Sequence, residues 1–245
     1  MEILLLRFDA PLISFGAPMV DKRGVIQPYP ALSMITGMLA NALGYDHSEF
    51  GRIERLQERL EYASRQDRRG EKLQDFHTVD FTQEHLDASH AWTTRGTLEG
   101  RETRLQKQTH IRERDYWVDA VHTVAVTVDD AGESPTVGDL AEAVQRPERP
   151  LFIGRKTCLP AAPIYLDTTR QMTLVDALEH APLHPRADDG PRYRAWWPCE
   201  PGDDDGADIA RPVTDRRDWR NQIHVGERWI AEGSITVHAE ENDDD

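Results

Sequence analysis

The fold is decided by residues 95–128, which read RGTLEGRETRLQKQTHIRERDYWVDAVHTVAVTV. The first part, Arg95 to Arg114, holds six Lys/Arg and three acidic residues, in a chain whose formal net charge is −15. The second part, Tyr116 to Val128, alternates apolar and polar residues and predicts one long β-strand. A basic, polar arm that leaves a sheet is well suited to gripping a phosphate backbone. The alternative is a solvated charged hairpin.

The residues just before this stretch also indicate an arm that protrudes from a sheet. Residues 80–112 show no sustained apolar period, and a polar insert of about 30 residues inside a compact domain is unusual unless it is functional. Residues 61–79 predict a β-hairpin around Asp67-Arg68-Arg69-Gly70, whose second arm ends in Phe76-His77-Thr78-Val79. We therefore expect a protruding arm carried by strands on either side of it.

Closer to the N-terminus, the pattern predicts a strand followed by two helices. Met1 to Asp9 is the strand, residues 10–30 are a loop rich in Pro and Gly, and Ser33 is the expected cap of a helix that ends at Gly44. A second helix runs from about Ser48 to Leu60, and a third covers Thr136 to Val144 after the long strand.

The order strand, helix, helix, strand, strand, insert, strand is close to an α+β domain of the ferredoxin-like or RNA-recognition-motif type. We expect this domain to cover residues 1–145, with a thumb insert at about 80–112. Residues 146–245 are expected to form a small, irregular β-rich part packed on it, with an acidic tail at 240–245.

Composition limits the class of protein. The chain is 38% hydrophobic and 30% charged, and it has no apolar run near the roughly 20 residues of a membrane span. The apolar start holds Glu2 and Arg7 and is expected to be a strand rather than a signal peptide. Two cysteines, Cys158 and Cys199, favour reduced thiols in the cytoplasm. Only four residues are Lys, so nearly all positive charge is Arg, which suits phosphate contacts.

The histidines raise the possibility of catalysis. A metal-independent ribonuclease would draw its acid and base from Tyr29, His77 and His110, with Lys107 stabilising the phosphorane charge. The other interpretation is that His77 and His122 are packing or hydrogen-bonding residues of strands. No pair has zinc spacing, and no nucleotide-binding motif is present. Gly154-Arg155-Lys156 is a short basic turn and a weak phosphate signal. We therefore expect no cofactor and no metal.

Four blocks of residues carry a further signal. They are Leu4-Leu5-Leu6-Arg7-Phe8 with Pro11 and Ser14-Phe15-Gly16; Tyr29-Pro30 with Ser33, Gly37 and Leu43-Gly44; Asp75-Phe76-His77-Thr78-Val79 with Gln108-Thr109, Arg114, Tyr116 and Asp119-Ala120; and Gly154-Arg155-Lys156-Thr157-Cys158 with Pro163. In these blocks and their order the chain resembles the type I-E form of the fifth Cas protein family, the CasD-like subunits of the Cascade CRISPR surveillance complex.

The resemblance implies a ferredoxin-like palm of the RAMP superfamily, a thumb hairpin, and a non-catalytic role. Such subunits hold the 5′ handle of the CRISPR RNA and cap a backbone of CasC subunits. The further partners implied are CasA, with CasB and CasE in the same complex, and target DNA through the complex. The alternative within the superfamily is an endoribonuclease that cuts precursor CRISPR RNA, as in type I-C systems.

The residues expected to touch RNA fall into two groups. The thumb would use Arg95, Arg101, Arg104, Lys107, Gln108 and Arg112, and the palm would use Lys22, Arg23, Ser33, His77, Arg114, Tyr116, Arg155 and Lys156.

Overall fold

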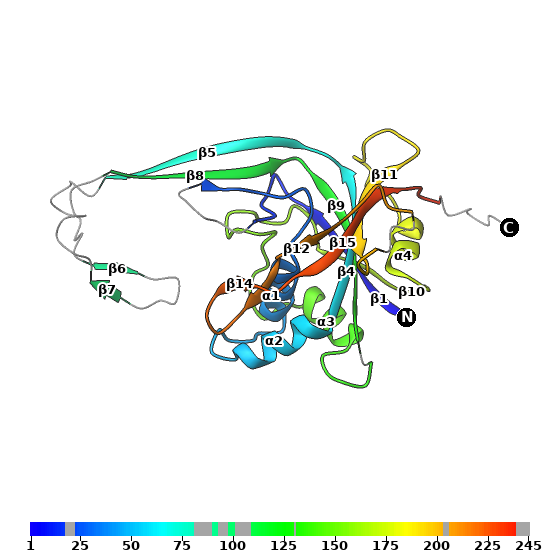
Figure 1. Ribbon diagram of the computed structural model, residues 1–245, viewed down its shortest axis with the longest axis horizontal. Coiled ribbons are helices and arrows are strands. Elements are labelled where there is room, and N and C mark those ends of the chain that lie inside the picture. The colour runs from blue at the N-terminus through cyan, green and yellow to red at the C-terminus, as the bar shows by residue number, and fades with distance from the viewer. Residues whose placement is uncertain are drawn as a thin grey trace.

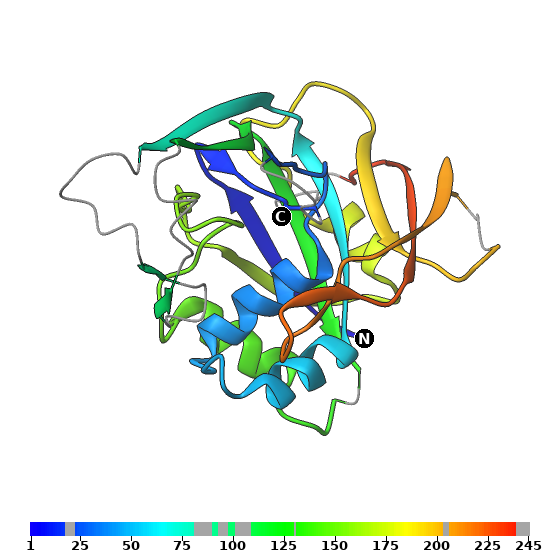
Figure 2. The same ribbon diagram turned by 60° about the vertical axis from the view of Figure 1, so that its left-hand side comes forward.

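One seven-stranded sheet organises the molecule, and helices cover both of its faces (Figures 1 and 2). The computed structural model describes residues 1–17, 23–80, 90–92, 98–100, 109–129, 131–202 and 206–238. Helices α1 (Leu32–Ala42), α2 (Phe50–Arg59) and α3 (Val137–Gln145) pack over one face, and α4 (Leu174–His180) packs over the other. No helix within these ranges is long and apolar enough to cross a bilayer.

The sheet has the order β10-β1-β9-β4-β11-β15-β12, and its neighbouring strands run antiparallel. The strands are β1 (Glu2–Asp9), β4 (Leu60–Arg68), β9 (Val121–Val128), β10 (Tyr165–Arg170), β11 (Tyr193–Pro198), β12 (Ile209–Val213) and β15 (Arg228–Ile235). Because β10 pairs with β1 and β11 pairs with β4, one sheet joins strands from both sides of residue 145. The predicted division of the chain into two parts at that residue is not tested by this pairing and stays a prediction.

The first strand is buried on both faces, which explains its unbroken apolar run. Leu4, Leu6 and Phe8 point toward α1, α2 and α3, as the alternation predicts, whereas Ile3 and Leu5 join the core under α4. The predicted first strand is confirmed.

A long two-stranded ribbon leaves this sheet. It consists of β5 (Glu71–Asp80) and β8 (Thr109–Val118), which pair from Glu71 opposite Val118 to Asp80 opposite Thr109. The short strands β2 (Leu12–Ile13) and β3 (Arg23–Gly24) pair with β8 near its base. Figure 1 shows the ribbon extending away from the helices, with the paired strands β6 (His90–Trp92) and β7 (Leu98–Gly100) beyond it.

Two predictions fail at the base of the ribbon, for one physical reason. Residues 61–79 are not a hairpin, because β4 pairs with β9 and β5 pairs with β8. The single strand predicted over Tyr116 to Val128 is likewise two strands. Gly70 and Asp119 both adopt positive φ, +67° and +59°. The chain therefore turns sharply at both of its passages between sheet and ribbon, from β4 to β5 and from β8 to β9.

The helices form where they are predicted, but α1 begins in an unexpected way. Ser33 does not cap it; the N-cap is Ala31, which makes no side-chain cap. Asp215, far away in the sequence, accepts from two backbone N–H groups of the first turn, Leu32 to its Oδ2 at 2.9 Å and Ser33 to its carbonyl oxygen at 3.0 Å. By contrast, Thr136 caps α3 locally in a capping box with Asp139.

Candidate nucleic-acid interface

A groove of about 640 Å³ opens where the base of the ribbon meets α1. Its nitrogen-bearing titratable side chains are His47, Arg114, Arg155, Lys156, Arg217 and His224. Among the residues that the structure describes, no Asp or Glu lines it. In a chain with 44 acidic residues and 29 Lys/Arg, this separation of charge makes the groove a local site of positive potential.

The turn that carries Arg155 and Lys156 is fixed by backbone contacts. Gly154 has φ +102°, and a Cβ at this position would lie 1.9 Å from the carbonyl oxygen of Ser14. Ser14 donates its backbone N–H to Ile153 at 3.1 Å, and Cys158 closes the turn by donating to Arg155 at 2.8 Å. Only glycine fits at position 154, which is why a glycine leads this basic turn.

Arg155 is held in place from three sides. Its guanidinium donates to the carbonyl oxygens of Asp115 at 2.7 Å and Gly24 at 3.0 Å, and it lies 4.8 Å from the ring centre of Tyr116. A Cβ on Gly24 would lie 2.6 Å from Arg155 Nη2, so Gly24 makes room for the guanidinium. Tyr116 is only 4% exposed. The ring packs against the Arg155 guanidinium, and the predicted contact of Tyr116 with RNA stays a prediction.

The two faces of the ribbon carry different basic residues. Side chains directly opposite each other in antiparallel strands share a face, and successive residues alternate. The register therefore places His77 beside Arg112 and Asp75 beside Arg114 on the face that leads to the groove. Arg112 is exposed there, and its predicted contact with RNA stays a prediction.

Arg23 lies on the opposite face of the ribbon, and its predicted contact with RNA stays a prediction. Its guanidinium is 3.2 Å from the Asp115 carboxylate, which Lys72 also contacts at 3.0 Å. Burial by itself raises the pKa of Asp115, but hydrogen bonds from Lys72 and Arg23 outweigh it and leave the pKa lowered. The cations on this face are thus neutralised within the chain.

The other predicted residues fall into three groups. Ser33 and Lys156 line the groove, Ser33 nearly buried at 8% exposure and Lys156 exposed. His77 lies on the ribbon with its Nε2 2.6 Å from an Asp75 carboxylate oxygen, and both are about half exposed. The remaining predicted contacts lie outside the described residues and stay predictions, namely Lys22, Arg95, Arg101, Arg104, Lys107 and Gln108.

Of the groups considered for catalysis, Tyr29 and His77 are described with their side chains, and their surroundings differ; Lys107 and the side chain of His110 lie outside the described part of the chain. Tyr29 is fully buried against Trp196, and its hydroxyl accepts from Arg211 at 3.1 Å. His122 is also buried, and burial lowers its pKa to about 4, so it is neutral and packs in β9 as predicted. His77 was expected within a strand and is, but it is exposed. In the described part of the chain no three His, Cys, Asp or Glu side chains are grouped to hold a metal ion.

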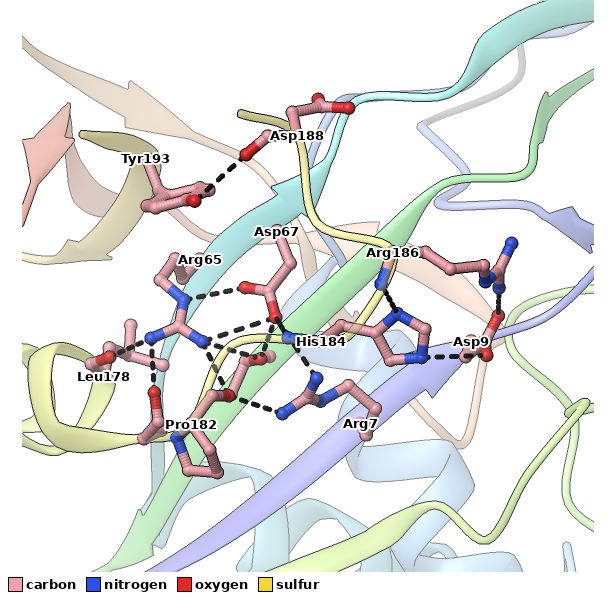
Figure 3. Close-up of polar contacts among 12 residues, drawn as sticks. Arg7, Asp9, Arg65, Asp67, Leu178, Pro182, His184, Arg186, Asp188 and Tyr193 are labelled. Atoms are coloured by element: carbon pink, nitrogen blue, oxygen red, sulfur yellow. Dashed lines mark hydrogen bonds and ion pairs between the residues drawn. The ribbon is translucent and has the colours of Figure 1, made fainter. Parts of the chain in front are cut away.

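A second polar cluster has a structural explanation (Figure 3). Asp67 has no exposed side-chain surface, and its carboxylate accepts from Arg65 at 2.7 Å, Thr123 at 2.9 Å and the His184 backbone N–H at 3.2 Å. Arg7 adds an ion pair at 3.3 Å. Because the carboxylate is occupied by partners within the chain, this cluster fastens the segment after α4 to the sheet.

Three groove residues were not predicted: His47, Arg217 and His224. Arg217 and His224 come from a small hairpin of β13 (Arg216–Asp218) and β14 (Ile223–Val225), in a region where the sequence has little periodicity. Strands of three residues are too short to give an alternation signal.

The fold and the groove define an α+β protein with a candidate polyanion-binding surface at the base of a β-ribbon. A family model described as CRISPR-associated protein (Cas_Cas5) matches residues 3–231, so the chain belongs to the Cas5 family of CRISPR-associated proteins. The chain is 28% identical to the CRISPR system Cascade subunit CasD of Escherichia coli (strain K12) over 173 residues, 67% of this chain and 70% of the relative.

Solved structures agree with that assignment. One described as a CRISPR RNA-guided surveillance complex contains a chain with 26% identity and a TM-score of 0.68, with 96% of this chain and 90% of that one covered. A second, described as the crystal structure of a Cas protein, has 25% identity and a TM-score of 0.65, with 96% and 95% covered. The expected mixed α+β fold and the resemblance to CasD-type members are confirmed.

Proposed function

We propose that this chain is a non-catalytic subunit of a type I-E CRISPR Cascade complex that binds the 5′ handle of the CRISPR RNA. In this role it caps the backbone of CasC subunits and contacts CasA, in a cytoplasmic ribonucleoprotein that also holds CasB and CasE and targets DNA. The observation that carries the proposal is the groove, whose lining includes Arg114, Arg155, Lys156 and Arg217 and, among the described residues, no Asp or Glu.

The topology supports a ferredoxin-like palm. Strands β1, β4, β9 and β10, with α1 and α3 between them, follow the order strand, helix, strand, strand, helix, strand. In space they lie side by side as β10-β1-β9-β4, all antiparallel. The ribbon of β5 and β8 then stands where a thumb would be inserted between the second and third of these strands.

The geometry favours binding over catalysis. Polynucleotide binding needs cations spaced along a surface, and the groove and the exposed Arg112 on the ribbon supply them. General acid–base cleavage needs an acid and a base within reach of one phosphate. Of the groups considered, Tyr29 is buried and His77 is on the ribbon with Asp75.

The test is co-expression of this chain, carrying an affinity tag, with the other Cascade subunits and a CRISPR array from the same organism. We expect recovery of a large ribonucleoprotein that contains RNA of uniform length with its 5′ handle protected from nuclease. The Lys156→Gln variant should recover less RNA per chain, whereas Arg170→Gln, an exposed arginine on β10, should not. Recovery of the chain alone, with cleavage of repeat RNA, would overturn the proposal in favour of the endoribonuclease.

A further inference from the structure

The hairpin of β13 and β14 forms part of the groove wall and is firmly docked. Both the side-chain amide and the side-chain oxygen of Gln57 in α2 bond to the backbone of Arg217, at 2.9 and 3.1 Å. Trp219 packs so closely on α1 that a Cβ on Gly37 would lie 3.1 Å from its ring. Figures 1 and 2 show the hairpin lying against α1 and α2. Its side chains therefore hold fixed positions before any ligand arrives.

Two nitrogen-bearing side chains of this hairpin act as a pair. Arg217 lies directly opposite His224 in the strand register, so both side chains are on the same face of the hairpin. Both line the groove. The Nε of Arg217 and the Nδ1 of His224 are buried and have no hydrogen-bond partner within the described chain. Buried polar atoms are normally paired, so these two nitrogens lack a partner that is usually present.

The charge of Arg217 is also uncompensated. Its guanidinium donates to the side-chain oxygen of Gln222 at 2.7 Å, and no carboxylate within the described ranges forms an ion pair with it. Burial lowers its pKa, which means that the cation is held at a cost. The nearest acids in sequence are engaged elsewhere: Asp218 accepts from the backbone and side-chain N–H groups of Asn221 at 2.7 and 2.8 Å. Asp215 pairs with Arg228 at 2.7 Å and accepts from the first turn of α1. An anion in the groove would supply the missing partner.

His224 lies in the same positively charged surroundings as Arg217. Burial and then the neighbouring Arg217 lower its pKa, while Asp215 and a hydrogen bond with the Arg216 backbone oppose that shift. The other titratable groups of the groove are His47, Arg114, Arg155 and Lys156, all of them bases. A phosphate beside the imidazole would reverse this balance, because a nearby negative charge favours the protonated ring.

We propose that Arg217 and His224 form a phosphate subsite that takes one phosphate group of the bound RNA backbone, and that His224 takes up a proton from solvent when that phosphate binds. This subsite rests on the proposed RNA-binding function of the groove. It adds the β13–β14 hairpin, from the C-terminal part of the chain, to an interface otherwise formed by the ribbon, α1 and the turn at Gly154.

The first experiment measures binding of the full chain to a fluorescein-labelled single-stranded RNA of eight nucleotides, by anisotropy over a range of salt concentrations. We expect Arg217→Gln to weaken binding about tenfold, the effect of losing one charge-assisted hydrogen bond. The slope of log K against log salt should fall by about 0.7, as for one phosphate contact. Arg217→Lys should restore the slope because it keeps the charge, and the distant Arg170→Gln should change neither quantity.

The second experiment measures proton coupling. Wild-type affinity should rise as the pH is lowered from 8 to 6, and His224→Gln should lose part of that rise. If His224→Gln keeps the full pH dependence, or if Arg217→Gln keeps wild-type affinity and slope while Lys156→Gln weakens binding, the subsite is wrong and the proposed function stands.

A third probe separates failure of the subsite from failure of the function. If wild-type protein shows no salt-dependent RNA binding, the proposed function fails, and calorimetry with pyrophosphate decides the subsite. Heat of binding that is present in the wild type and absent in Arg217→Gln would support the subsite. Absence of heat in both proteins, or equal loss in Arg170→Gln, would overturn it.

Discussion

Gly70 approaches the backbone of Val118 so closely that a Cβ at position 70 would lie 2.4 Å from the Val118 carbonyl oxygen. This contact joins the segment between β4 and β5 to the segment between β8 and β9, at the point where both leave the sheet and become the ribbon. A Cβ there would also lie 2.7 Å from the backbone nitrogen of Ala120. The direction of the ribbon, and with it the position of Arg112 and Arg114, thus depends on one glycine.

Gly70→Ala is therefore expected to lower the free energy of unfolding by about 3 kcal/mol, since it adds a backbone clash to an unfavourable φ of +67°. Urea denaturation measures the loss. The matched control is Gly51→Ala in α2, where a Cβ meets nothing within 4 Å, and it should leave stability unchanged or slightly raised. Equal stability of the two variants would contradict the assigned role of Gly70.

The start of α1 gives a second prediction. Asp215 is buried at 1% exposure, accepts from the Leu32 N–H, and forms an ion pair with Arg228 at 2.7 Å. Asp215→Ala removes the helix cap and leaves Arg228 without its carboxylate, so we expect a loss of about 3 kcal/mol. Denaturation of the variant is compared with that of Asp208→Ala, an exposed acid, which should behave as wild type. A loss below 1 kcal/mol for Asp215→Ala would show that the first turn of α1 does not depend on it.

Local periodicity was sufficient to predict α1, α2, α3 and the first strand, but not α4 or the strand pairing. The sequence Asp67-Arg68-Arg69-Gly70 has the composition of a hairpin turn. Whether this segment forms a hairpin is decided by residues about 50 positions away, because the backbone of Val118 packs directly against Gly70. The cap of α1 is equally remote, with Asp215 and Leu32 separated by 183 positions.

The site was predictable in part for similar reasons. Gly154-Arg155-Lys156 is predictable because a glycine-led basic turn is a local signal, and the close approach of Ser14 explains why the glycine is required. The burial of Tyr116 cannot be predicted from its own strand, because the arginine that covers its ring, Arg155, comes from another loop. Arg217 and His224 gave no signal because their pairing and their position depend on contacts with α1 and α2.

His122 gives a prediction of acid sensitivity. Its pKa in the folded chain is about 4, below the ordinary value of 6.5, because it is buried between Phe15 and Trp196. Between those two values the unfolded chain binds a proton and the folded chain does not, so stability falls as the pH is lowered. We expect a loss of about 2 kcal/mol between pH 7 and pH 5 from this residue.

Urea denaturation at the two pH values checks this contribution. His122→Gln should reduce the difference in unfolding free energy between pH 7 and pH 5, whatever its effect on stability at pH 7. His47→Gln, which alters an exposed histidine, should keep that difference. An unchanged difference in His122→Gln would place the source of acid sensitivity elsewhere.

The two faces of the ribbon give the last prediction. Arg112 is exposed on the face that leads to the groove, whereas Lys72 lies on the other face, 3.0 Å from Asp115. Arg112→Gln should weaken RNA binding and lower the salt slope by about 0.7, because a cation available to phosphate is lost. Lys72→Gln removes the same charge from the chain, but Arg23 still compensates Asp115, so RNA affinity and slope should stay close to wild type. Anisotropy titrations at several salt concentrations compare the pair. An equal loss in both variants would mean that RNA senses only the net charge of the ribbon, and a loss confined to Lys72→Gln would place the RNA on the opposite face.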